Sequence, residues 1–72
     1  MSKSIHSREY KKVIEKLKFA REESGLKQTE VAEKLDKPQS YISKIESGER
    51  RIDVAELKQF AKIYVKDINF FI

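Results

Sequence analysis

No cysteine occurs among the 72 residues of this chain, so neither disulfide bonds nor a thiolate zinc site can stabilise it. A chain of this length holds one domain, and it lies near the size below which a hydrophobic core alone no longer sustains folding. Lysine and glutamate dominate the sequence, which has only two glycines and one proline, and no alternating β-branched run indicates a strand. We therefore expect an all-α fold that is stabilised by helix packing.

Apolar residues recur at three- and four-residue spacing along most of the chain, which is typical of amphipathic helices. We expect residues 1–7 to form a flexible N-terminal arm and residues 8–72 to form one domain. Five helices are predicted in that domain: 8–24, 28–35, 39–47, one that begins after Asp53, and a final short turn at 68–72.

Several residues indicate where these helices begin and end. Asp53 and Glu56 have the spacing of a capping box, and Ser7 is a candidate N-cap for the first helix. Gly25 and Gly48 stand where a helix needs a left-handed residue at its C-terminus. The helix boundaries are therefore predicted mainly by local signals.

The formal net charge of +4 is unevenly distributed, because the first 27 residues account for all of it. Net charge alone gives only mild support for a polyanionic partner. No apolar run approaches membrane-spanning length, and the N-terminal residues lack the apolar core of a signal peptide. We expect a soluble, cytoplasmic protein.

Two segments with fixed spacing carry the strongest signal: GLKQTEVA at residues 25–32 and PQSYISKIESGERR at residues 38–51. Together they resemble the phage-repressor and Cro type of helix-turn-helix, the XRE-like family of prokaryotic regulators. The resemblance covers residues 14–71. It implies a compact five-helix, lambda-repressor-like DNA-binding domain, in which the helices at 28–35 and 39–47 form the helix-turn-helix motif of residues 28–47.

The resemblance also implies how DNA is bound: the helix at 39–47 enters the major groove, and the helix at 28–35 lies across the sugar-phosphate backbone. Gln39 can pair bidentately with adenine, and Lys44 can donate to guanine, while Ser40 and Ser43 can bond to bases or phosphate. These four residues are the predicted base contacts. The predicted backbone contacts are Gln28, Lys37, Tyr41, Arg50 and Arg51, of which either arginine could instead reach a minor groove.

In similar repressors, the positions of Arg21 and Glu46 form an ion pair between the first helix and the end of the third. We expect that pair to be structural here. The chain departs from the family pattern at Asp36, where glycine is usual in the turn, and at Lys27, which replaces the usual N-cap. Aspartate tolerates a left-handed backbone better than most residues, so the turn is expected to persist.

Catalysis finds little support in the sequence. The only histidine, His6, lies in the expected N-terminal arm, and there is no glycine-rich phosphate loop. We therefore expect a non-enzymatic protein without a cofactor or metal, specifically a prokaryotic transcriptional repressor that is nucleoid-associated when bound.

A second hypothesis is a protein-interaction module, such as an antitoxin or a regulator-binding domain, that keeps the helix-turn-helix frame. Phe19 is predicted to be exposed, and Phe70, Phe71 and Ile72 crowd the C-terminus of the sequence. Exposed apolar residues of this kind mark a dimer or partner surface. We favour a homodimer on a palindromic operator, with two recognition helices roughly 34 Å apart. The apolar end of the sequence is also compatible with the front domain of a longer protein.

Overall fold

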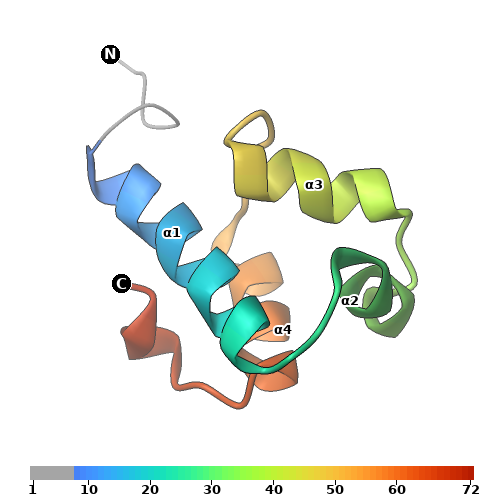
Figure 1. Cartoon of the computed structure of the whole chain (residues 1–72). Coiled ribbons are helices and arrows are strands. Elements are labelled where there is room, and N and C mark those ends of the chain that lie inside the picture. Colours follow the sequence, from blue (N-terminus) through green and yellow to red (C-terminus); the bar gives the residue numbers. More distant parts are fainter. Residues whose placement is uncertain (1–7) are drawn as a thin grey trace.

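This computed structural model describes residues 8–72 of the chain, which contain four α-helices and one short 3-10 turn. The α2 and α3 helices pack on each other at one end, and the C-terminal residues return beside α1 (Figure 1). No strand occurs within this range, so the all-α prediction is confirmed. The elements are α1 (Arg8–Glu23), α2 (Gln28–Leu35), α3 (Gln39–Ser47), α4 (Val54–Ile63) and η2 (Ile68–Phe70).

The α2 and α3 helices have the predicted bounds, and α1 ends one residue earlier than predicted. The predicted capping box of α4 is present: Glu56 N donates to Asp53 Oδ1 over 2.8 Å, and Asp53 N donates to Glu56 Oε1 over 3.1 Å. The expected N-cap Ser7, like His6, lies outside the described residues. None of the helices between residues 8 and 72 is long and apolar enough to cross a membrane.

The turn between α2 and α3 is preserved although aspartate replaces the usual glycine. Asp36 has φ 58° and ψ 46°, which is the left-handed conformation expected of it. Its N–H donates to the Glu33 carbonyl over 3.1 Å, and Lys37 N donates to the Ala32 carbonyl over 2.9 Å. These bonds close the end of α2, and Pro38 then precedes α3 in an extended conformation.

The predicted fifth helix is wrong in kind, because the C-terminal element is the 3-10 turn η2. Asp67 caps it, accepting from Asn69 N over 2.8 Å. The turn is closed by bonds from Phe70 N to the Asp67 carbonyl and from Phe71 N to the Ile68 carbonyl. Three residues give the tight i to i+3 pattern and are too few for an α-helix.

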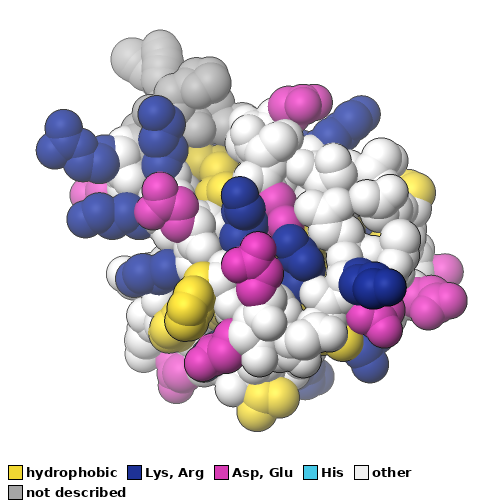
Figure 2. Space-filling model, viewed as in Figure 1, with side chains coloured by type: hydrophobic (Ala, Val, Ile, Leu, Met, Phe, Trp, Pro, Cys, Tyr) yellow, Lys and Arg dark blue, Asp and Glu magenta, His cyan; other side chains and the backbone are white. Residues whose placement is uncertain are grey.

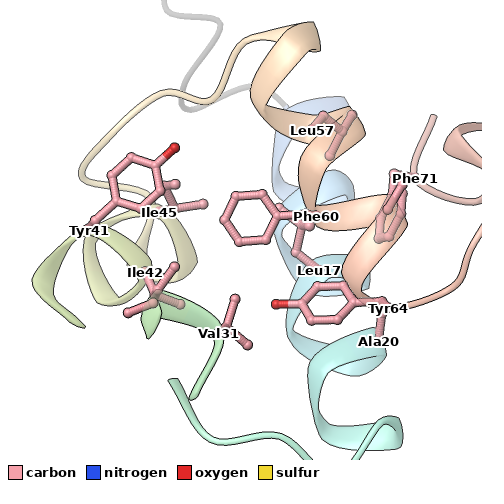
Figure 3. Close-up of a cluster of buried hydrophobic side chains, with 12 residues drawn as sticks. Leu17, Ala20, Val31, Tyr41, Ile42, Ile45, Leu57, Phe60, Tyr64 and Phe71 are labelled. Carbon is pink, nitrogen blue, oxygen red and sulfur yellow. The ribbon is translucent and has the colours of Figure 1, made fainter. Parts of the chain in front are cut away.

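A hydrophobic core joins all four helices and the C-terminal segment (Figure 3). Phe60 of α4 is 1 % exposed and lies between two tyrosine rings, with centroid distances of 6.4 Å to Tyr41 and 6.0 Å to Tyr64. Phe71 is also 1 % exposed, so η2 delivers an aromatic ring to the core. Each remaining helix contributes at least one fully buried residue, among them Leu17, Val31, Ile42 and Ile45.

Tyr64 carries a polar group into this core. Its side chain is 3 % exposed, and its hydroxyl has no hydrogen-bond partner within residues 8–72. Burial raises the pKa of Tyr64 further above its ordinary value, at which the hydroxyl is already protonated at neutral pH.

We predict that Tyr64→Phe keeps the free energy of unfolding or raises it by up to about 1 kcal/mol, because a buried hydroxyl without a partner is costly. Urea denaturation measures the change. Leu17→Ala is the control for a damaged core and should lose about 2–5 kcal/mol. A loss above about 1 kcal/mol for Tyr64→Phe would mean that the hydroxyl is satisfied after all.

Candidate nucleic-acid interface

The α3 helix has one buried face and one outer face. Tyr41, Ile42, Ile45 and Glu46 are buried. The predicted base contacts lie on the other side of the helix, where Gln39, Ser40 and Lys44 are exposed and Ser43 is half-buried. Figure 2 shows mostly uncharged side chains over α3, whereas Lys and Arg gather over α1. The outer face of α3 is therefore a polar surface with little charge.

Arg21 and Glu46 form an ion pair between α1 and the end of α3. Arg21 Nε donates to Glu46 Oε2 over 2.8 Å, and its Nη2 donates to Oε1 over 3.0 Å. The third nitrogen, Nη1, donates to the Leu26 carbonyl in the α1–α2 connection over 3.1 Å. The side chains are only 14 % and 5 % exposed, and the hydrogen bond to Glu46 raises the pKa of Arg21. Arg21 thus joins three segments of the chain.

Two glutamines continue from this ion pair to the outer face of α3. Gln28, the first residue of α2, donates from Nε2 to Glu46 Oε1 over 3.0 Å. Gln39, the first residue of α3, donates from Nε2 to Gln28 Oε1 over 2.8 Å. We call these four residues the Arg21–Glu46–Gln28–Gln39 network. The sequence predicts Gln28 as a DNA-backbone contact but does not predict its bond to Gln39, because the two glutamines are brought together only by the path of the turn.

Tyr41 is a correction to the predicted backbone contacts. The residue is 8 % exposed, and its hydroxyl is buried, so it cannot reach a phosphate from this position. Instead its ring lies below two cations, with Lys37 Nζ 5.2 Å and Arg50 Cζ 4.6 Å from the centroid. Both cations were themselves predicted to contact DNA. Tyr41 therefore supports candidate contacts rather than being one.

Arg50 and Arg51 are neighbours in the α3–α4 connection but have different surroundings. Arg50 makes a two-pronged bond to Glu56, with Nη1–Oε1 at 3.2 Å and Nη2–Oε2 at 3.1 Å. Its Nη1 also donates to the Arg51 carbonyl over 2.9 Å. Arg51 itself is exposed. The Arg50–Glu56 pair could not be predicted from the sequence, because the six-residue separation crosses a helix cap and matches no helical period.

Tyr10 of α1 attaches this connection to the rest of the domain. Its hydroxyl accepts from Ile52 N over 2.8 Å and donates to the Arg50 carbonyl over 3.4 Å. The connection is thus fixed from both sides, by α1 through Tyr10 and by α4 through Glu56. Arg51 is consequently presented to solvent from a well-supported segment.

The predicted dimer or partner surface is only partly present. Phe19 is 54 % exposed and Ile72 is 75 % exposed, while Phe70 is half-buried and stacks on Phe19 at a centroid distance of 6.5 Å. Phe71 was wrongly included, because η2 turns it into the core. Lys16 and Lys66 lie over the Phe70 ring, at 5.9 and 4.9 Å from its centroid. The stacked rings of Phe19 and Phe70 therefore form a small apolar patch with basic neighbours.

In a comparison with known protein families, residues 17–71 fit the model of the family described as Helix-turn-helix. No curated protein matches the chain significantly. The matched region contains all of the network residues and the whole α2–turn–α3 unit. The chain therefore belongs to the helix-turn-helix family of the Cro and repressor type. It is a DNA-binding protein of the transcription-regulator kind.

The Arg50–Glu56 pair generates a prediction about acid stability. The hydrogen bonds from Arg50 lower the pKa of Glu56 below its ordinary value. A lowered carboxylate pKa contributes stability that is fully present above the unfolded value, about 4.3, and is lost as the pH falls through the folded value. We expect Glu56→Gln to lose less stability than the wild type between about pH 5 and pH 3.

Denaturation midpoints measured across that pH range test this expectation. Arg50→Gln removes the partner instead of the carboxylate and should reduce the acid dependence in the same way. Unchanged acid dependence in both variants would contradict the assigned role of the pair.

Proposed function

We propose that this protein reads double-stranded DNA sequence-specifically, with the outer face of α3 in the major groove. The observation that carries the proposal is the position of Gln39, which lies exposed at the start of α3 and is held by Gln28 of α2. A held amide meets the requirement of bidentate pairing with adenine better than a freely rotating one. Ser40, Ser43 and Lys44 lie on the same face and are the other proposed base contacts.

We assign backbone contacts to Lys37 and Arg51, with Gln28 and Arg50 in supporting positions. The guanidinium of Arg50 is already engaged by Glu56, whereas Arg51 is exposed beside it. The basic residues of α1 add a general attraction to DNA that depends on salt. By this proposal, specificity and electrostatic affinity come from different parts of the domain.

Selection of bound sequences from a random DNA pool, read at two salt concentrations, tests the proposal directly. We predict that Gln39→Ala relaxes the preference at one base pair by about 1–3 kcal/mol. Arg51→Ala should instead weaken all sites alike and reduce the salt slope by about one. If the wild type enriches no sequence at either salt concentration, sequence-specific reading is wrong.

We further propose that the protein is a cytoplasmic prokaryotic repressor that binds a palindromic operator as a homodimer. The exposed Phe19, which stacks on the half-buried Phe70, and the exposed Ile72 support a dimer surface. In that dimer two α3 helices would lie roughly 34 Å apart, one DNA turn. The same patch also favours a second candidate, a module that holds another regulator or a toxin.

Sedimentation with and without DNA distinguishes these states. We predict concentration-dependent dimers for the wild type and a weaker dimer for Phe19→Ser, which should fold normally because Phe19 is more than half exposed. Val54→Ser, at another exposed apolar residue, is the matched control and should leave dimerisation unchanged. A strict monomer under all conditions would exclude the dimer. If Phe19→Ser impairs capture of a protein partner while Gln39→Ala has no effect on any function, the second candidate is favoured.

A further inference from the structure

Glu46 differs chemically from the two glutamines that follow it in the Arg21–Glu46–Gln28–Gln39 network. A carboxylate only accepts hydrogen bonds, whereas a glutamine amide can turn over and exchange its donor and acceptor ends. Glu46 is held by two hydrogen bonds from Arg21, at 2.8 and 3.0 Å, and its side chain is 5 % exposed. It is therefore a fixed acceptor at the buried end of the network.

This fixed acceptor sets the direction of the two bonds that follow. Gln28 must turn its Nε2 toward Glu46, as it does at 3.0 Å, which leaves its Oε1 facing Gln39. Gln39 must then turn its Nε2 toward Gln28, as it does at 2.8 Å. One N–H of Gln39 is used in that bond, so the amide keeps Oε1 and a second N–H for an outside partner.

We propose that Glu46 is a positioning residue for base recognition, which through Gln28 fixes the amide orientation of Gln39 and thereby favours adenine over guanine. The proposal rests on the proposed DNA-reading function. Adenine presents one donor, N6–H, and one acceptor, N7, which match the acceptor and donor that Gln39 keeps. Guanine presents two acceptors, O6 and N7, so it leaves the Oε1 of Gln39 without a donor.

Glutamine in place of Glu46 removes the fixed direction. The new amide can place either its oxygen or its NH2 group at the position that accepts from Arg21 and Gln28 in the native protein. When the NH2 group lies there, it donates to Gln28. Gln28 can accept that bond only with its Oε1, so its Nε2 turns to Gln39 and donates to Oε1 there. Both N–H groups of Gln39 then face outward, an arrangement suited to the two acceptors of guanine.

The experiment measures binding affinity for two operators that differ by adenine or guanine at one position, the base pair whose preference Gln39→Ala relaxes. We expect Glu46→Gln to lower the adenine-to-guanine affinity ratio about tenfold. Glu49→Gln makes the same charge change at an exposed site just after α3 and should leave the ratio unchanged. In a Gln39→Ala background, Glu46→Gln should change the ratio no further.

Two further variants separate orientation from loss of stability. Arg21→Lys weakens the ion pair but keeps the Glu46 carboxylate, so it should melt at a lower temperature and retain the ratio. Gln28→Leu leaves the ion pair intact but removes the hydrogen bonds between Glu46 and Gln39, so it should lower the adenine-to-guanine affinity ratio. This variant keeps the proposal testable even if Glu46→Gln folds poorly.

The outcomes distinguish this inference from the function on which it rests. If Gln39→Ala relaxes a base preference but neither Glu46→Gln nor Gln28→Leu lowers the ratio, the positioning role is wrong and the DNA-reading function stands. An equal fall of the adenine-to-guanine affinity ratio in Arg21→Lys would also overturn the positioning role, because the reduced stability of the domain would then explain the effect. If the wild type has no preference that Gln39→Ala relaxes, the proposed reading by α3 fails first.

Discussion

The ion pair between Arg21 and Glu46 connects the supporting helix α1 to the end of α3 and stabilises the packing of the two helices. Helices as short as α2 and α3 are not stable by themselves and need tertiary contacts. Both charges are largely removed from water, so the loss of one partner would leave a buried charge, which commonly costs 3–5 kcal/mol. The same carboxylate also holds Gln28. Stability and surface geometry are therefore coupled at Glu46.

The local features of the fold could be predicted because their causes lie within a few residues. The capping box at Asp53 and the left-handed Asp36 are examples, since each depends on the chemistry of one short segment. The burial of the C-terminal residues was harder to predict, because the three consecutive apolar side chains of Phe70, Phe71 and Ile72 cannot all face the core. Which of them does so depends on the turn: η2 directs Phe71 inward and leaves Ile72 exposed.

The candidate site shows the same difference between features that a short segment determines and features that depend on the path of the chain. The family pattern indicated which residues of α3 face outward, and the structure has Gln39, Ser40 and Lys44 exposed. It did not indicate the bonds made across turns, such as Gln28–Gln39 and Arg50–Glu56, which depend on the path of the backbone in three dimensions. The predicted backbone contact of Tyr41 was wrong because its position on α3 is compatible with either face of the helix. Its ring packs on Phe60 of α4 and so lies in the core.

The hydrogen bond between Gln28 and Gln39 also affects how the surface of such a domain could change over generations. If residue 39 alone were replaced by an apolar side chain, the Oε1 of Gln28 would lose its donor. This loss is unfavourable because Gln28 is half-buried. A change at both positions could restore the pairing with a different outward group. New operator preferences would then arise most readily through coupled substitutions at 28 and 39, and related proteins should show these two positions varying together.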